Sequence, residues 1–290
     1  MPSLTIRWRR VLLAGGAVAL LAVLFGAART ALHAHRMVNP PRVPVVGSFE
    51  GAREVTLRTS DGLTLRADFI PSKNGAAILL GHGMEQNRRA LAFEAKTLAA
   101  RGYGVLMLDW RGAGESEGGR PTWGADEVRD VRAALDFLGA QPGVDPARLG
   151  ALGFSMGGSA IIKEAADDPR LRAFVIEGTP GSLAQEIHFE FGHWGVFSRT
   201  VARWVFECEG IRVAEVNPVD HVCQLAPRPI LFWMGAEDAP HDSLLAMTRS
   251  ACGPSRTVWM HGAGHGGYAQ LDAPGYAREL TEFFTAALGG

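Results

Sequence analysis

Three residues have side chains suited to nucleophilic catalysis, and the first of them is a serine in a distinctive setting. Ser155 stands in the pattern Gly-x-Ser-x-Gly at residues 153–157, between an apolar run and a helical pattern of small residues. A sharp turn from strand to helix at this point would hold the hydroxyl exposed at the end of a sheet. A serine hydroxyl is a poor nucleophile at neutral pH and needs a base within hydrogen-bond reach. The pattern therefore predicts a catalytic serine with partners elsewhere in the chain.

The expected partners follow two later apolar runs. Asp238 comes just after the run that ends at Met234, and His265 lies in a glycine-rich segment after the run that ends at Met260. Histidine suits the base because its pKa lies near neutral pH. A carboxylate can fix the tautomer of that histidine and stabilise the imidazolium. We therefore predict that Ser155, His265 and Asp238 act as nucleophile, base and acid.

Neighbouring residues of the same types leave alternatives open. Glu237 or Asp242 could supply the carboxylate in place of Asp238. His261 competes with His265, but it stands close to the end of the preceding apolar run. The small residues around His265 instead suit a loop that brings its ring over the sheet.

Acyl transfer also needs donors for the negative charge that develops on the substrate oxygen. One expected donor is the backbone N–H of Met156, which follows the serine at the start of a helix, where the helix dipole favours an anion. The second is expected from the loop at residues 82–85, with Met84 as the donor. These two amides are the predicted oxyanion hole.

The elements that must position these residues alternate along the chain. Two polar–apolar alternating runs flank an Asp-Gly turn at residues 61–62 and predict a β-hairpin. Short continuous apolar runs, typical of strands buried on both faces, then alternate with segments of helical spacing. This order predicts an α/β fold with a doubly wound, mostly parallel sheet and an antiparallel edge. The predicted strands cover residues 76–80, 105–108, the run before Ser155, 173–176, 230–234 and 257–260, and the predicted helices include 88–100, 125–138 and 273–288.

One long segment interrupts the alternation. Residues 181–227 form an insertion between two predicted strands and are rich in aromatic side chains. Long insertions without sheet structure often serve as lids or binding elements. We expect this one to cover the substrate, although its aromatic side chains could simply pack the insertion onto the main domain. The expected substrate-binding residues are Phe189, Phe191, Trp194, Phe197 and Trp204.

The N-terminal segment, residues 1–29, contains an uninterrupted apolar stretch from Val11 to Ala28 with arginines on both sides. About 18 residues in a helix rise roughly 27 Å, close to the hydrocarbon thickness of a bilayer. The basic residues before the stretch favour a cytoplasmic N-terminus, with the rest of the chain outside the cytoplasm. We therefore expect a membrane anchor. The alternative is a cleaved signal peptide and a secreted enzyme, because small residues at 26–28 suit processing.

Prolines after the apolar stretch predict an extended linker over residues 30–47, before a catalytic domain at 48–290. The chain has a formal net charge of −1, without the basic excess of a nucleic-acid-binding surface. Neither a metal nor a cofactor is expected, since Cys208, Cys223 and Cys252 are too widely spaced for a metal cluster. Three buried thiols are the favoured interpretation, and one disulfide is the alternative for an exported domain.

From about Val55 to the C-terminus, the sequence resembles the α/β-hydrolase superfamily. Within it, the sequence is similar to the serine esterase, lipase and aminopeptidase-like branch, which carries His-Gly before the first sheet helix, here at residues 82–83. The pattern Asp-x-Arg-Gly-x-Gly-x-Ser at residues 109–116 resembles the loop after the fourth strand in that branch. The resemblance implies the same roles for the three catalytic candidates and the two oxyanion-hole methionines.

The residues and the resemblance together favour a serine hydrolase. We expect it to cleave a small carboxylic ester or thioester with an apolar acyl group through an acyl-enzyme. The first alternative is an aminopeptidase-like enzyme, which would need an acidic group to hold a free amine. The second is a membrane-tethered binding protein that keeps the fold without the activity. The acidic candidates for amine binding are Glu186, Glu190, Glu207 and Glu209.

Overall fold

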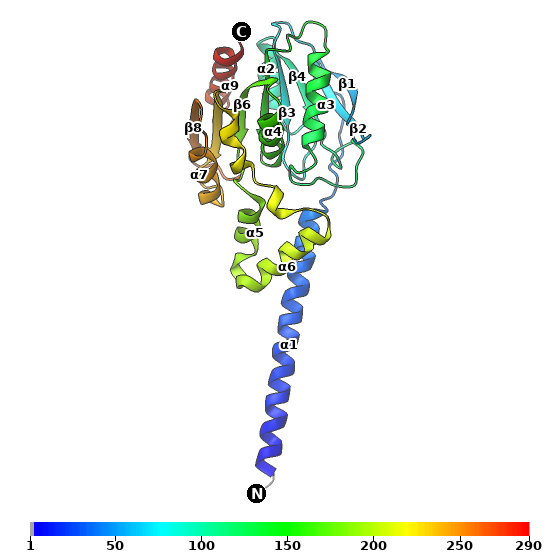
Figure 1. Cartoon of the computed structure of the whole chain (residues 1–290), viewed down its shortest axis with the longest axis vertical. Coiled ribbons are helices and arrows are strands. Elements are labelled where there is room, and N and C mark those ends of the chain that lie inside the picture. Colours follow the sequence, from blue (N-terminus) through cyan, green and yellow to red (C-terminus); the bar gives the residue numbers. More distant parts are fainter. Residues whose placement is uncertain (1–2, 290) are drawn as a thin grey trace.

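The structure is a computed structural model that describes residues 3–289, apart from the side chains of residues 3–7 and 194. Eight strands form one sheet in the order β1-β2-β4-β3-β5-β6-β7-β8 (Figure 1). β2 is antiparallel to both of its neighbours, and every later pair in the sheet is parallel. The predicted mostly parallel sheet with an antiparallel edge is confirmed.

The strands are β1 (Arg53–Arg58), β2 (Thr64–Ile70), β3 (Ala77–Gly81), β4 (Gly104–Leu108), β5 (Leu149–Phe154), β6 (Leu171–Glu177), β7 (Ile230–Gly235) and β8 (Ser255–Met260). The α-helices are α1 (Ser3–Val38), α2 (Ala92–Ala100), α3 (Val128–Gly139), α4 (Met156–Asp167), α5 (Leu183–Phe191), α6 (Gly195–Cys208), α7 (His241–Arg249), α8 (Tyr268–Leu271) and α9 (Ala273–Leu288). Short 3₁₀ helices are η1 (Gly192–Trp194), η2 (Val213–Glu215), η3 (Pro218–Asp220) and η4 (Val222–Leu225).

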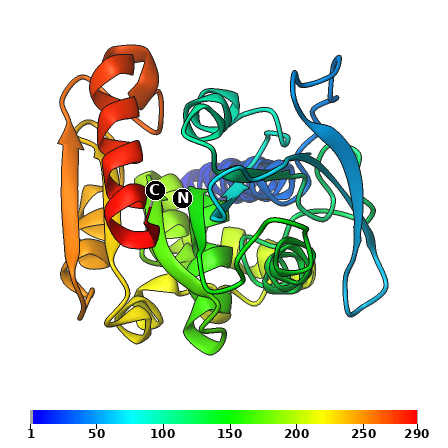
Figure 2. The same cartoon turned by 90° about the horizontal axis from the view of Figure 1, so that it is seen from above.

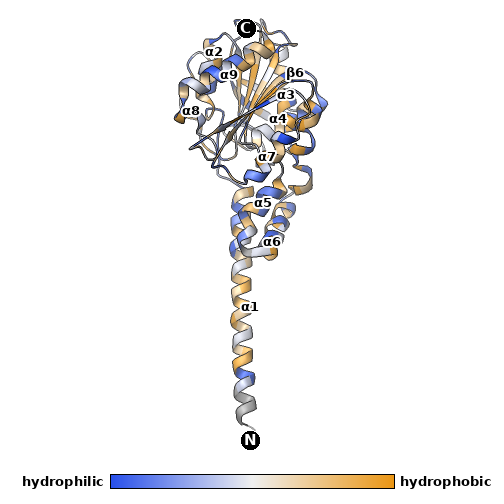
Figure 3. Ribbon diagram, turned by 90° about the vertical axis from the view of Figure 1, so that its left-hand side faces the viewer, coloured by the Kyte–Doolittle hydropathy of each residue, from blue (hydrophilic) through white to orange (hydrophobic). Residues whose placement is uncertain are grey.

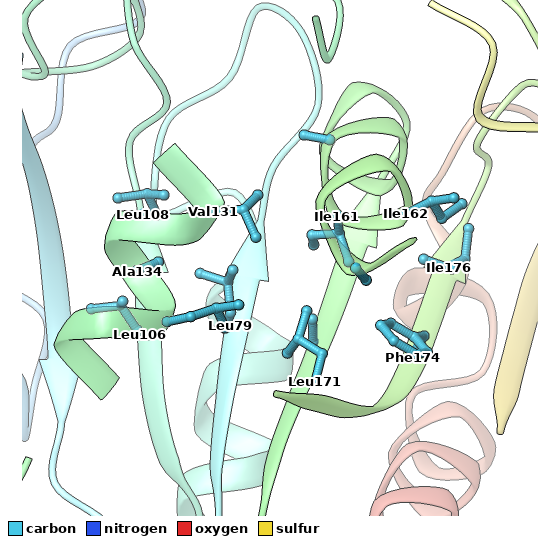
Figure 4. Packing of buried hydrophobic residues seen from close by; sticks show 14 of the residues in the cluster. Leu79, Leu106, Leu108, Val131, Ala134, Ile161, Ile162, Leu171, Phe174 and Ile176 are labelled. Atoms are coloured by element: carbon cyan, nitrogen blue, oxygen red, sulfur yellow. The ribbon is translucent and has the colours of Figure 1, made fainter. Parts of the chain in front are cut away.

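Helices cover both faces of the sheet, which explains why β3, β4 and β5 are buried along their whole length. Because neighbouring strand residues point to opposite faces, Leu79 packs on the side of α3 and α4, and Ile78 packs on the side of α2 and α9. Figure 2 shows this layering from above. In Figure 4, Val131 of α3 and Ile161 of α4 lie over Leu79. This packing fixes the carboxyl edge of the sheet, where the candidate catalytic loops begin.

The loop at residues 109–116 encloses a buried charge network. The Asp109 carboxylate accepts hydrogen bonds from the guanidinium and the backbone N–H of Arg88, each at 2.6 Å. It also accepts the backbone N–H of Glu115 at 3.0 Å. A Cβ atom on Gly114 would lie 2.2 Å from the same carboxylate, so only glycine fits there. The Arg88–Asp109 pair therefore explains the aspartate and the second glycine of this sequence pattern, while Arg111 of the pattern pairs with the buried Asp130.

Replacing Asp109 by alanine is expected to lower the free energy of unfolding by about 3 kcal/mol, because the backbone N–H groups of Arg88 and Glu115 lose their acceptor and the Arg88 guanidinium keeps only Asp68 as a buried partner. The matched control is Asp136→Ala, which removes an exposed partner of Arg170 and should cost about 1 kcal/mol or less. Urea titrations of the detergent-solubilised protein, followed by tryptophan fluorescence, measure both. Equal losses in the two variants would contradict the structural role of the buried pair.

Residues 181–227, which we call the cap, lie between the α/β layers and the free part of α1 (Figure 1). α1 is continuous to Val38, so the predicted extended linker is wrong for residues 30–38, which are helical. The physical reason is packing: Ala34 and Val38 are fully buried against α5 and α6 of the cap. The extended path begins only at the prolines that follow.

The remaining, lower part of α1 stands free of the rest of the molecule, with its apolar side chains exposed (Figure 3). Within the described residues, Trp8–Val38 is long and apolar enough to cross a membrane. The same property suits a signal sequence near the N-terminus. The structure thus contains one candidate anchor, joined to the cap without a break.

The expectation of three buried thiols is wrong. Cys223 of η4 and Cys252, which precedes β8, form a disulfide, and Cys208 at the end of α6 is exposed. The fold brings the first two within bonding distance, with Cα atoms 4.7 Å apart although 29 residues separate them in the chain. The disulfide ties the end of the cap to the last strand of the sheet.

Candidate active site

Ser155 occupies the sharp turn between β5 and α4. Its backbone φ of 52° lies in a region that residues other than glycine rarely adopt. The turn is tight on both sides: a Cβ atom on Gly157 would lie 2.2 Å from the carbonyl oxygen of Gly81, and one on Gly153 would lie 2.6 Å from Gly158. The backbone N–H of Ser155 donates to the carbonyl of Glu177 at 2.8 Å. These contacts hold the hydroxyl at the carboxyl edge of the sheet.

The structure brings Ser155, His265 and Asp238 together in one chain of hydrogen bonds. Oγ of Ser155 lies 2.9 Å from Nε2 of His265. Nδ1 of the same ring lies 3.0 Å from Oδ2 of Asp238. The other oxygen of the buried Asp238 carboxylate accepts the backbone N–H of Ala239 at 2.8 Å, which fixes its orientation. The ring of Phe154 packs against His265, with centroids 4.9 Å apart.

The alternative acid and base candidates lie outside this arrangement. Glu237, Asp242 and His261 are all exposed, and none of their side chains joins these hydrogen bonds in the described part of the chain. Asp238 and His265 meet because β7 and β8 are neighbouring parallel strands. The loops that follow their carboxyl ends, which carry these two residues, therefore lie side by side.

Two shifted pKa values mark the site. Burial lowers the pKa of His265, but the hydrogen bond and charge of Asp238, together with the charge of Glu186, outweigh burial and raise the pKa above its usual value. Burial raises the pKa of Glu186 to about 7. The charge of His265 lowers this pKa, and the charge of Asp238 raises it further. A base with a raised pKa holds a proton more firmly once it has accepted one from Ser155.

A cavity of about 180 Å³ opens beside the serine hydroxyl, between the sheet edge and the cap. Two atoms in its wall are unusual: among the described residues, Oε1 of Glu186 and Nε1 of Trp123 are buried and have no hydrogen-bond partner. A buried polar atom without a partner is costly, so these atoms mark positions where a ligand could donate a hydrogen bond to Glu186 and accept one from Trp123. Besides Ser155, His265 and Asp238, the wall includes Met84, Trp123, Met156, Leu183, Glu186, Val216, Pro218 and Leu244.

Met84 and Met156, the predicted oxyanion-hole residues, both line this cavity. Within residues 3–289, neither backbone N–H donates to a protein acceptor. The loop that carries Met84 is held by its neighbours: the Gly83 N–H donates to Gln86 at 2.9 Å, and Trp110 donates to the His82 carbonyl at 2.8 Å. Burial lowers the pKa of His82 to about 4, so its ring is neutral at physiological pH.

Four of the five aromatic residues expected to bind substrate lie away from this cavity. Phe191 is buried in the core that the cap shares with α1, while Phe189, Phe197 and Trp204 are largely exposed. None of these four lines the cavity at Ser155, and the side chain of Trp194 lies outside the described residues. The cap residues that do line the cavity are Ser182, Leu183, Glu186, Val216 and Pro218.

The sequence offered one indication of these cap residues. Glu186 stands in a helix whose inward face is otherwise apolar, with Leu183, Ile187 and Phe191 buried beside it. An acidic residue bordering such a face suggests a polar function. For a metal there is no comparable arrangement, because the described residues contain no group of three or more His, Cys, Asp or Glu side chains placed to hold one.

Known proteins share this sequence pattern and this fold. Residues 72–212 match the family model described as serine aminopeptidase, S33. An uncharacterized protein of Mycobacterium tuberculosis is 30% identical over 250 residues, which cover 82% of this chain and 81% of that protein. The thiohydrolase aneE of Aspergillus aculeatus is 35% identical over 127 residues, which cover 42% of this chain and 40% of that protein.

Among solved structures, the esterase Pf2001 of Pyrococcus furiosus has a TM-score of 0.71 with this chain. The alignment covers 87% of this chain and 100% of the esterase, at 21% sequence identity. At that identity the likeness establishes a shared fold.

Proposed function

Because the chain belongs to the α/β-hydrolase superfamily, we propose that it is a serine hydrolase that cleaves a carboxylic ester or thioester with an apolar acyl group. The observation that carries the proposal is the hydrogen-bonded chain from Ser155 through His265 to Asp238, at the mouth of a mostly apolar cavity. Such a chain activates a hydroxyl that is otherwise a weak nucleophile.

In the first half-reaction, Oγ of Ser155 attacks the acyl carbon while Nε2 of His265 takes its proton. Asp238 stabilises the imidazolium through Nδ1, and the backbone N–H groups of Met84 and Met156 stabilise the oxyanion. His265 then gives its proton to the leaving alcohol or thiol as the bond to the acyl carbon breaks. In the second half-reaction, water loses a proton to His265 and attacks the acyl carbon. The bond to Oγ of Ser155 then breaks, and His265 returns the proton to Oγ, which releases the acid and regenerates Ser155.

The apolar cavity wall supports an apolar acyl group. Leu183, Val216 and Leu244 present side chains without hydrogen-bonding groups to the space beside Ser155. Each methylene transferred from water to such a wall is worth about 0.8 kcal/mol, or roughly fourfold in kcat/KM, until the cavity is full. The thiohydrolase aneE, similar over part of the chain, supports thioesters beside oxygen esters.

A series of p-nitrophenyl esters and matched acyl thioesters, beside aminoacyl p-nitroanilides, tests this assignment. We expect kcat/KM to increase with acyl length over the first few members and to remain much lower for the anilides. Faster cleavage of the anilides, with a requirement for a free amine, would contradict the assignment to esters.

The second candidate function is an aminopeptidase-like activity, and Glu186 favours it. Its buried, unpartnered Oε1 lies in the wall of the cavity that holds the serine, where an ionised carboxylate could accept a hydrogen bond from a substrate amine. The match to the serine aminopeptidase model agrees with that possibility. The apolar remainder of the wall is the reason that we rank the ester first.

Glu186→Gln separates the two functions. For an amine-binding site, the variant should lose about 10–100-fold in kcat/KM on aminoacyl anilides, the value of a hydrogen bond to a charged group. For an ester site, kcat/KM at alkaline pH should change little. The acidic limb of the pH profile should shift to lower pH, because the charge that helps to raise the pKa of His265 is gone.

The control for Glu186→Gln is Glu215→Gln, since Glu215 is an exposed acidic residue of the cap outside the cavity wall. This control should leave both the anilide rates and the pH profile of ester hydrolysis unchanged. An unshifted acidic limb in Glu186→Gln would show that Glu186 does not act on His265.

We place the catalytic domain outside the cytoplasm, held by α1 in the membrane. The exposed apolar surface of α1 and the arginines before it support this orientation. The Cys223–Cys252 disulfide supports it independently, because structural disulfides persist in oxidising compartments. Membranes washed with alkaline carbonate should retain the full-length chain, whereas a soluble product that starts near Arg29 would favour signal cleavage.

A further inference from the structure

A second cavity, whose wall does not include Ser155, lies between α1 and the lower edge of the cap. It is a groove of about 520 Å³, and it is nearly three times as large as the cavity at the serine. Its walls are mainly apolar, and its polar residues lie toward the upper part of α1. The lining residues are Ala22, Val23, Phe25, Gly26, Arg29, Thr30 and His33 of α1, with Glu190, Phe191, Phe197 and Ser198 of the cap.

The level of the groove along α1 determines what surrounds it. Ala22 and Gly26 belong to the apolar stretch that ends at Ala28, so this wall continues the surface of α1 that faces the hydrocarbon of a bilayer. At a rise of 1.5 Å per residue, Ala22 lies about 9 Å below Ala28. Phe197 lines the same groove, and the level of Ala22 is within the depth at which interfacial helices bury their apolar faces, roughly 5–10 Å.

The cap cannot leave this level without breaking its contacts with α1. Ala34 and Val38 are buried in the core that the cap shares with α1. His33 forms a 2.7 Å hydrogen bond with Glu190, and His35 forms a 2.9 Å hydrogen bond with Glu209. The exposed side chains at the lower tip of the cap are thus held beside the apolar stretch.

We propose that this groove holds an acyl chain of a membrane lipid and that the tip of the cap, Val196 and Phe197, is seated in the membrane interface. These two side chains are 70% and 50% exposed, which is unfavourable in water and favourable at this depth in a bilayer. Arg29 lines the groove just beyond the end of the apolar stretch, at the level where lipid phosphates lie. The groove thus offers apolar walls to the chain and a cation to the headgroup.

α5 connects this groove to the active site. Leu183 and Glu186 line the cavity at Ser155, and Glu190 and Phe191 line the groove. Four residues of helix, about 6 Å, separate Glu186 from Glu190. The walls of the two cavities are therefore one helical turn apart along α5, so the inferred substrate class is an ester that resides in the bilayer. This last step rests on the proposed hydrolase function, while the lipid groove itself rests only on the anchoring of α1.

The groove is tested with an environment-sensitive fluorophore on the full chain. Phe197→Cys, in a background with the free Cys208 replaced by serine, is labelled with nitrobenzoxadiazole and reconstituted into phosphatidylcholine vesicles with or without brominated acyl chains. The control label is attached to Lys73→Cys in the same background. Lys73 is an exposed residue before β3, at the opposite end of the sheet from the loops that carry the catalytic candidates. We expect blue-shifted emission and bromine quenching at position 197 and neither effect at position 73.

Water-like emission at position 197 without bromine quenching, from protein that remains with the vesicles, would overturn the proposal. Efficient cross-linking of Phe25→Cys chains into dimers, combined with an unquenched label, would assign the groove to a second copy of this chain instead. Quenching at position 197 in a protein that cleaves no ester would support the groove and reject only the hydrolase function.

A kinetic experiment tests the link to the active site. The rates are measured for a fluorogenic ester embedded in vesicles and for a soluble p-nitrophenyl ester. In Phe197→Ser we expect the ratio of the vesicle rate to the soluble rate to fall by about tenfold or more, the scale on which burial of a phenylalanine side chain operates. An unchanged ratio would overturn the role of the groove in substrate supply.

Discussion

Replacement of Ser155 by alanine is expected to lower kcat for ester hydrolysis by roughly 10⁴–10⁶-fold, which leaves only the contribution of binding and the oxyanion hole. The hydroxyl lies 2.9 Å from Nε2 of His265 and faces the cavity, so its removal takes away the group that would attack the substrate. Initial rates with the best p-nitrophenyl ester measure the loss. Covalent labelling by a fluorophosphonate probe gives an independent readout, since the probe needs an activated serine.

The matched control is Ser60→Ala, which removes an exposed serine in the turn between β1 and β2. That variant should retain both the rate and the labelling. If folded wild-type protein is not labelled and cleaves no ester, the hydrolase proposal fails. The alternative of a membrane-tethered binding protein would then account for the fold.

Asp238→Asn should cost about 10⁴-fold in kcat, although the side chain keeps its size and shape. An amide at this position can present N–H to Nδ1 of His265 and favour the wrong tautomer, and it no longer stabilises the imidazolium. The pKa of His265 should also fall, because the hydrogen bond and charge of Asp238 are what raise it against burial. The pH profile of kcat/KM would then begin its rise at lower pH, on a much lower plateau.

Glu237→Gln is the control for Asp238→Asn, because Glu237 is the adjacent carboxylate and is exposed. It should leave kcat within about twofold of wild type, as expected for a surface side chain without a catalytic contact. A large loss in Glu237→Gln with little loss in Asp238→Asn would transfer the acid role to Glu237.

The sheet and the three catalytic candidates could be predicted because their information is local. β3, β4 and β5 are short runs buried on both faces, and such runs stand out in the sequence. Ser155 is recognisable from the glycines that its turn requires. Asp238 and His265 follow the ends of adjacent strands, so the order of elements already places them together.

The cap could not be predicted in the same way, because apolar residues serve several purposes there. Phe191 packs in the cap core, Phe197 lines the groove beside α1, and Leu183 faces the serine, yet their residue types do not distinguish these places. The pairing of Cys223 with Cys252 likewise depends on the tertiary approach of the cap to β8. Helix propensity alone gave no reason to extend α1 to Val38, since the contacts that stabilise its last turns come from the cap.

α1 is one continuous helix whose two parts have different surroundings, and the boundary between them falls near Ala28. Below it, the helix carries the exposed apolar side chains of the candidate anchor; above it, Ala34 and Val38 complete the interior of the cap. A soluble version of the protein should therefore start just after Ala28, which keeps these two side chains in place. A version that starts at residue 48, after the predicted linker, would lack them and expose the apolar interior of the cap beside Ser155.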